Sequence, residues 1–111
     1  MTIIITSDHG SVRCENAAKI SSRHELSGGL RFKEGKDILC SPNEGFLIDN
    51  PEAYRLPDKN SEKDYILAVE DNYFLYENQF DTYKDIFHGS FQHGGISLEE
   101  MILPCVILEP R

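Results

Sequence analysis

The chain has 111 residues, with 19 acidic and 11 basic side chains and a formal net charge of −8. This length corresponds to one small domain or to part of a larger one. The acidic balance argues against binding to duplex nucleic acid or to an anionic membrane surface, because both need a basic face on the protein. Hydrophobic residues make up 40% of the chain, which supplies a folded core and excludes a disordered acidic tail.

Targeting and redox features predict a cytoplasmic protein. No apolar run approaches the roughly 20 residues of a membrane-spanning helix. The opening Met-Thr-Ile-Ile-Ile-Thr lacks the basic region and the cleavage site of a secretory signal. The cysteines are Cys14, Cys40 and Cys105, an odd number without C-x-x-C spacing. They indicate neither a disulfide framework nor a thiolate zinc cluster, so we expect a reducing compartment.

The first expected element is a strand at residues 3–5, Ile-Ile-Ile. A β-branched run without polar alternation is typical of a parallel strand that is covered on both faces. The other wholly apolar strand candidate that follows a helix is residues 105–108, so we expect these two segments to pair in parallel. One edge of the first strand would then stay open, and an open apolar edge recruits another strand. We therefore expect self-association.

The middle of the chain is expected to be irregular and rich in β-structure. The strand candidates are residues 30–33, 46–48, 65–69 and 73–76. Each combines β-branched or aromatic residues with turn residues at its ends. The last two candidates are separated only by Glu-Asp-Asn, which predicts a hairpin.

Two helices are expected toward the C-terminus. Residues 79–88 follow Asn78, a good N-cap, and carry Asp81 in the first turn, where the helix dipole favours a negative charge. Gly89 then stops this helix. A second, shorter helix is indicated by Ser97 and Glu100, which fit a capping box before the apolar strand at residues 105–108.

Chemistry-bearing residues form two clusters. Asp8-His9-Gly10 follows the first strand, at the strand end where α/β sheets bind ligands. An adjacent carboxylate and imidazole can reach one zinc ion at about 2.0–2.2 Å, although Asp8 capping a turn beside a solvent-facing His9 is the alternative. His93 begins a His-Gly-Gly loop before the capped helix. It would be an ordinary surface histidine if it stood alone, but beside Asp8 and His9 it supplies a third donor.

The two clusters together resemble a known family. Thr-Ser-Asp-His-Gly, followed much later by Phe-Gln-His-Gly-Gly-Ile-Ser-Leu-Glu-Glu-Met-Ile-Leu-Pro, is similar to the PglZ branch of the alkaline phosphatase superfamily. The similarity is closest to the output domain of PorX-type response regulators. It extends through residues 30–33 and 73–76 and covers nearly the whole chain.

The resemblance implies an α/β fold, in which residues 1–111 form the C-terminal part of an alkaline-phosphatase-like sheet. Residues 11–77 would be a β-rich insertion between the two motifs. Residues 78–111 would contribute a helix, the His-Gly-Gly loop, the capped helix and the final strand.

The resemblance also implies a two-metal site, usually zinc, that hydrolyses phosphate esters through a serine or threonine. Asp8 and His9 match the pair that binds the nucleophile-side metal, and His93 matches a ligand of the other metal. Two such cations clamp the attacking and leaving oxygens. The family nucleophile and its remaining ligands lie upstream of the Asp-His pair. The chain is therefore expected to need a missing N-terminal half and to be inactive alone.

The resulting hypothesis is a fragment of a metal-dependent phosphoesterase or phosphodiesterase that acts on a phosphate ester or nucleotide. It would serve as the output domain of a two-component response regulator. Arg31 and Lys33 are candidates for substrate contact, although a solvated strand face is the alternative. The rival hypothesis is a non-catalytic PglZ-like binding or regulatory module. The shared site requires His9 and His93 side chains within about 12 Å of each other.

Overall fold

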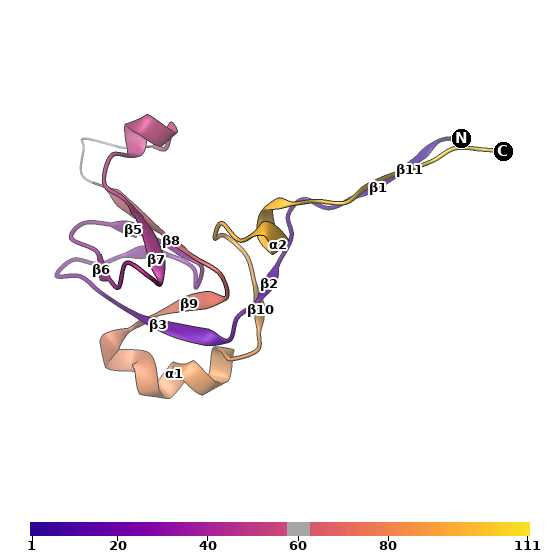
Figure 1. The fold of residues 1–111 in the computed structure, drawn as a ribbon. Coiled ribbons are helices and arrows are strands. Elements are labelled where there is room, and N and C mark those ends of the chain that lie inside the picture. The colour runs from indigo at the N-terminus through magenta and orange to yellow at the C-terminus, as the bar shows by residue number, and fades with distance from the viewer. Residues whose placement is uncertain (58–62) are drawn as a thin grey trace.

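A computed structural model gives the structure of the chain and describes residues 1–57 and 63–111. Figure 1 shows a β-rich body from which a two-stranded ribbon projects, with both ends of the chain at the ribbon's tip. The radius of gyration is 16.8 Å and the longest extent is 61 Å. A compact chain of this length would have a radius of gyration of about 13 Å. The projecting ribbon accounts for the difference.

The ribbon consists of β1 (Ile3–Thr6) and β11 (Cys105–Leu108). These strands pair antiparallel, with Ile3 opposite Leu108. The predicted partner is thus confirmed and the predicted parallel direction is wrong, because the chain leaves and re-enters the body along one path. All residues of both strands are exposed. The ribbon therefore presents apolar side chains to water on both faces.

A second antiparallel ladder joins the ribbon to the body. It pairs β2 (Val12–Arg13) with β10 (Phe91–Gln92). The short helix α2 (Leu98–Met101) follows β10, and its capping box of Ser97 and Glu100 is present, as predicted. The two halves of the chain therefore run side by side through this joint.

The body contains two larger sheets. In one, β3 (Asn16–Ser21) lies between an antiparallel β6 (Leu39–Cys40) and a parallel β9 (Asn72–Tyr76). The other has the order β4-β5-β8-β7 and is antiparallel throughout. Its strands are β4 (Ser27–Gly28), β5 (Phe32–Gly35), β8 (Asp64–Ala68) and β7 (Gly45–Ile48). The predicted hairpin is wrong, because β8 and β9 pair in different sheets although they are consecutive.

Two apolar clusters form the core, one on each side of β9. Phe74 belongs to the first cluster, while its neighbours Tyr73 and Leu75 belong to the second. This division follows from the alternation of side chains along a strand. The first cluster comprises Ala18, Ile20, Leu26, Ile38, Ile66, Ala68 and Phe74. The second comprises Val12, Cys14, Tyr73 and Leu75, with Phe80 and Phe87 packed against it.

The predicted long helix is confirmed as α1 (Phe80–Phe87), which lies against β9 and β3 (Figure 1). One 3-10 turn, η2 (Glu77–Gln79), precedes it, so the N-cap is Gln79 and the expected cap at Asn78 is wrong. A second 3-10 turn, η1 (Pro51–Tyr54), follows β7. The chain thus mixes helices and strands, with strands predominating. Within the described residues, no helix is long and apolar enough to cross a membrane.

Candidate metal site

The two ladders bring the predicted histidines together. His9 lies between β1 and β2, and His93 directly follows β10. Because β2 pairs with β10 and β1 with β11, the two connections lie beside each other at the joint. The imidazole rings stack, with centroids 3.7 Å apart and planes inclined by 23°. The expected proximity of the histidines is confirmed, and their role as metal ligands stays a prediction.

His9 is oriented by its own loop. Its Nδ1 atom lies 2.7 Å from the carbonyl oxygen of Gly10. A carbonyl only accepts hydrogen bonds, so Nδ1 carries a proton and Nε2 is the nitrogen that can bind a cation. Metal-binding histidines commonly donate their second ring N–H to a backbone carbonyl in this way. His9 is therefore prepared to bind a cation through Nε2.

Asp8 lies beside that nitrogen. Its Oδ1 atom accepts a hydrogen bond from the His9 backbone N–H at 2.9 Å and lies 3.7 Å from His9 Nε2. Two zinc ligands at about 2.0–2.2 Å in tetrahedral geometry lie roughly 3.4 Å from each other. The two donor atoms therefore fit one cation with little movement. Both side chains are open to solvent, so a cation can enter directly.

His93, the third predicted donor, is not directed at the position that Asp8 and His9 share. An imidazole binds a cation in the plane of its ring, and the stacked rings of His9 and His93 keep their lone pairs in two separate planes. In residues 1–57 and 63–111, no three His, Cys, Asp or Glu side chains converge so as to hold one metal ion. The described residues therefore offer two donors, Asp8 and His9, at one place and a single donor, His93, at another.

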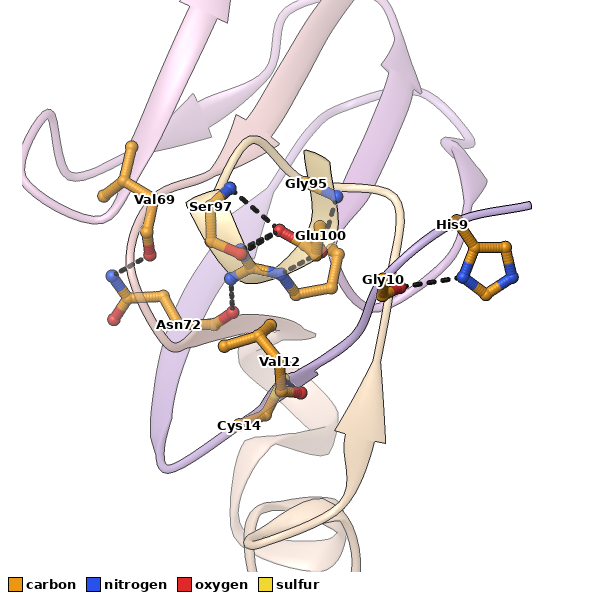
Figure 2. A network of polar contacts seen from close by, with 10 residues as sticks. His9, Gly10, Val12, Cys14, Val69, Asn72, Gly95, Ser97 and Glu100 are labelled. Carbon is orange, nitrogen blue, oxygen red and sulfur yellow. Dashed lines mark hydrogen bonds and ion pairs between the residues drawn. The ribbon is translucent and has the colours of Figure 1, made fainter. Parts of the chain in front are cut away.

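Glu100 of α2 holds both histidine-bearing segments. Figure 2 shows its carboxylate with Gly95 and Ser97, and His9 beside Gly10. The carboxylate accepts hydrogen bonds from Gly95 N–H at 2.9 Å, Ser97 N–H at 2.9 Å and the Ser97 hydroxyl at 2.6 Å. Its backbone carbonyl accepts from Gly10 N–H at 3.0 Å. Glu100 thus fixes the loop after His93 and the residue after His9.

Arg31 connects Glu100 to the body. Its guanidinium is fully buried and binds the carboxylate bidentately, from Nε at 2.9 Å and Nη2 at 2.8 Å. Nη1 donates to the backbone carbonyl of Asn72. Burial raises the pKa of the Glu100 carboxyl, but hydrogen bonds from Arg31, Ser97 and Gly95 outweigh it and hold the pKa at about 2. The sequence indicated Glu100 only as a helix cap, and it gave no sign of this pair.

The alternative of a solvated strand face for Arg31 and Lys33 is wrong, since both side chains are buried. The hydrogen bonds of the Arg31 guanidinium are to Glu100 and Asn72. The Nζ atom of Lys33 lies 5.0 Å from the ring centre of Tyr76. Among the hydrogen bonds and ion pairs of the described residues, none joins either side chain to Asp8, His9 or His93. Their predicted contact with substrate stays a prediction.

The motif glycines permit close packing of backbone on protein atoms. A Cβ at Gly95 would lie 2.6 Å from Arg31 Nη2, and a Cβ at Gly10 would lie 1.8 Å from the carbonyl oxygen of Glu99. Gly94 has a φ of +108°, which favours glycine. The backbone at Gly95 therefore packs directly on the Arg31 guanidinium.

A protein-family model described as a BREX system PglZ alkaline phosphatase-like domain matches residues 1–108. The chain belongs to the PglZ family. The matched range includes both histidine motifs, all the strands and both α-helices. It confirms the resemblance to the PglZ branch of the alkaline phosphatase superfamily. The search of curated proteins gives no match. A special closeness of this PglZ chain to PorX-type domains stays a prediction.

Proposed function

We propose that this PglZ chain contributes to a two-metal phosphoesterase site, as the C-terminal part of the catalytic domain. Asp8 and His9 are the ligands of one cation, and His93 is a ligand of the other. The main support for this proposal is the stacking of two histidines from distant motifs, with ring centroids 3.7 Å apart. Cations in two-metal sites lie about 3.5–4 Å apart. Side-by-side imidazoles at this spacing suit neighbouring cations.

Zinc is the proposed metal, because imidazole nitrogen and carboxylate oxygen are both common zinc ligands. When bound, it would supply Lewis-acid stabilisation of charge on a phosphoryl group. The residues of this chain orient the donors. The Gly10 carbonyl oxygen accepts a hydrogen bond from His9 Nδ1–H, and Glu100 anchors the loops that carry both rings.

The proposal extends to the rest of the catalytic site, the substrate and the partners. The nucleophilic hydroxyl and the other ligands come from a preceding segment of the complete domain, so this chain alone is inactive. The substrate is a phosphate ester or nucleotide. The domain is cytoplasmic and is the output domain of a response regulator. The exposed β1–β11 ribbon mediates association with another chain.

Zinc titration of the purified chain against a chromophoric chelator tests the ligand assignment. Asp8→Asn and His9→Ala are expected to weaken the tighter zinc equivalent at least tenfold, and His93→Ala to remove a second, weaker one. His88→Ala is the matched control, because His88 is an exposed histidine at the end of α1. Wild-type zinc affinity in both His9→Ala and His93→Ala would refute the assignment.

A non-catalytic binding or regulatory module is the second candidate. It is favoured by the two apolar clusters, which the body completes from its own residues. The same titration separates the candidates, since a binding module needs no zinc at Asp8 and His9. Metal-dependent phosphodiester hydrolysis by this chain, abolished in His93→Ala, would instead show that the chain carries a working site.

A further inference from the structure

A pocket of about 230 Å³ lies against α1, β5 and β9. Four aromatic side chains contribute to its wall, Phe74, Tyr76, Tyr83 and Phe87. Lys33 and Gln79 also line it, whereas Asp8, His9 and His93 do not. The pocket is therefore separate from the histidine pair, and what it binds does not depend on the function proposed above.

Lys33 lines this pocket, and its amine keeps some contact with solvent, because every fully buried side-chain nitrogen or oxygen among the described residues has a hydrogen-bond partner. The residue is 8% exposed, and its Nζ atom lies 5.0 Å from the ring centre of Tyr76, another lining residue. Within the part of the chain that the structure describes, this amine forms no hydrogen bond or ion pair. Burial lowers its pKa, as desolvation does for an ammonium without a counter-ion. The aromatic face offsets only part of the cost of burying the charge.

Arg31 is also a buried cation, but unlike Lys33 it has a counter-ion. Arg31 stands two positions before Lys33 and meets a carboxylate with two hydrogen bonds, at 2.9 and 2.8 Å. Buried charges in proteins are normally paired in this manner. Lys33 has aromatic neighbours but no anion among the described residues, and its amine is open to the pocket, so an anionic ligand in the pocket would be its counter-ion.

We propose that this pocket binds a small organic acid whose anionic group is attached to a single apolar ring. The anion pairs with Lys33, and the ring packs among the aromatic side chains of β9 and α1. The volume of about 230 Å³ lies below the roughly 300–1,000 Å³ of sites for drug-sized ligands. One ring with one carboxylate fits this space, and a dinucleotide does not.

Benzoate is the probe, titrated into the full chain and followed by NMR chemical shifts. Benzamide keeps the shape without the charge, and acetate keeps the charge without the ring. Benzoate is expected to shift signals of Lys33, Tyr76 and Tyr83, and to bind at least tenfold more tightly than either control compound. Equal binding of benzoate and benzamide, or shifts confined to other residues, would overturn the proposal without any variant being needed.

Lys33→Met keeps the length of the side chain and removes its charge. It is expected to lose at least tenfold in benzoate affinity while folding normally, because replacing a buried charge by an apolar group is tolerated. Lys19→Met is the matched control, since Lys19 Nζ lies 4.9 Å from the Phe80 ring centre and Lys19 does not line the pocket. Wild-type benzoate affinity in Lys33→Met would refute the role of the amine.

Discussion

Replacing Glu100 by glutamine is expected to loosen both histidine-bearing segments at once. The carboxylate accepts five hydrogen bonds, two from Arg31, two from Ser97 and one from Gly95. Glutamine has one side-chain acceptor oxygen in place of two, and its NH₂ group donates. The substitution therefore sets donor against donor and leaves the buried guanidinium of Arg31 without a counter-ion.

Two figures estimate the free energy of unfolding that Glu100→Gln would lose. Removing one partner of a buried ion pair costs about 3–5 kcal/mol. The pKa of Glu100 gives an independent figure. A carboxyl whose pKa falls from 4.5 to about 2 on folding adds about 3 kcal/mol of stability above pH 4.5, at about 1.4 kcal/mol per pH unit. We therefore expect Glu100→Gln to lower the free energy of unfolding by about 3–4 kcal/mol at pH 7.

Urea unfolding at pH 7, followed by circular dichroism, measures this loss. Glu99→Gln is the matched control, because it removes the same charge from an exposed neighbour in α2 and is expected to change stability by less than about 0.5 kcal/mol. A second readout is the ring-current shift that stacking imposes on the imidazole protons of His9 and His93. A loss below about 1 kcal/mol with the ring-current shifts retained would refute the reasoning.

Three further outcomes are expected. The stabilisation from Glu100 should be complete above pH 4.5 and lost as pH falls toward 2, because the pKa of Glu100 is lower in the folded state than in the unfolded state. The urea midpoints of wild type and Glu100→Gln, measured between pH 2 and 7, should therefore converge at the acid end. Gly10→Ala should destabilise by about 1–3 kcal/mol in the same assay, since its Cβ would lie 1.8 Å from a carbonyl oxygen of α2, whereas Gly29→Ala meets nothing within 4 Å and should be tolerated. Wild-type chain should self-associate at micromolar concentration in sedimentation, and Ile4→Lys in the ribbon should reduce this while Leu39→Lys, also exposed, should not; a monomeric wild type would contradict the prediction.

Local signals carried much of the fold prediction. The capping box predicted α2, and the acidic first turn with a glycine stop predicted α1. Apolar runs at residues 46–48 and 65–69 correspond to β7 and β8. Each of these patterns is written in a few consecutive residues, so it can be recognised without knowledge of the partner segment.

The predictions of strand pairing that were wrong concern partners far apart in the sequence. β8 and β9 are consecutive strands, but β9 pairs with β3 because apolar clusters form on both of its faces. β3 itself, Asn-Ala-Ala-Lys-Ile-Ser, has too weak a pattern to be recognised alone. Among the candidate site residues, the motifs predicted the meeting of His9 and His93, while the ion pair that positions them spans 69 residues.

The ion pair at the joint fixes the orientation of the groups it connects, which an apolar contact would not do. Hydrophobic packing is non-directional, whereas the Arg31–Glu100 pair specifies the direction of each hydrogen bond and links α2 to the Asn72 carbonyl. The double variant Arg31→Met with Glu100→Leu should therefore recover only part of the stability lost in Glu100→Gln, since apolar residues can replace a buried pair but the donors of Gly95 and Ser97 lose their acceptor. It should not recover the stacking of the two histidines, because Gly95 N–H then loses the carboxylate that holds its loop. Partly restored stability without restored ring-current shifts would show that the pair serves to position the histidines. Recovery of both would assign it to packing alone.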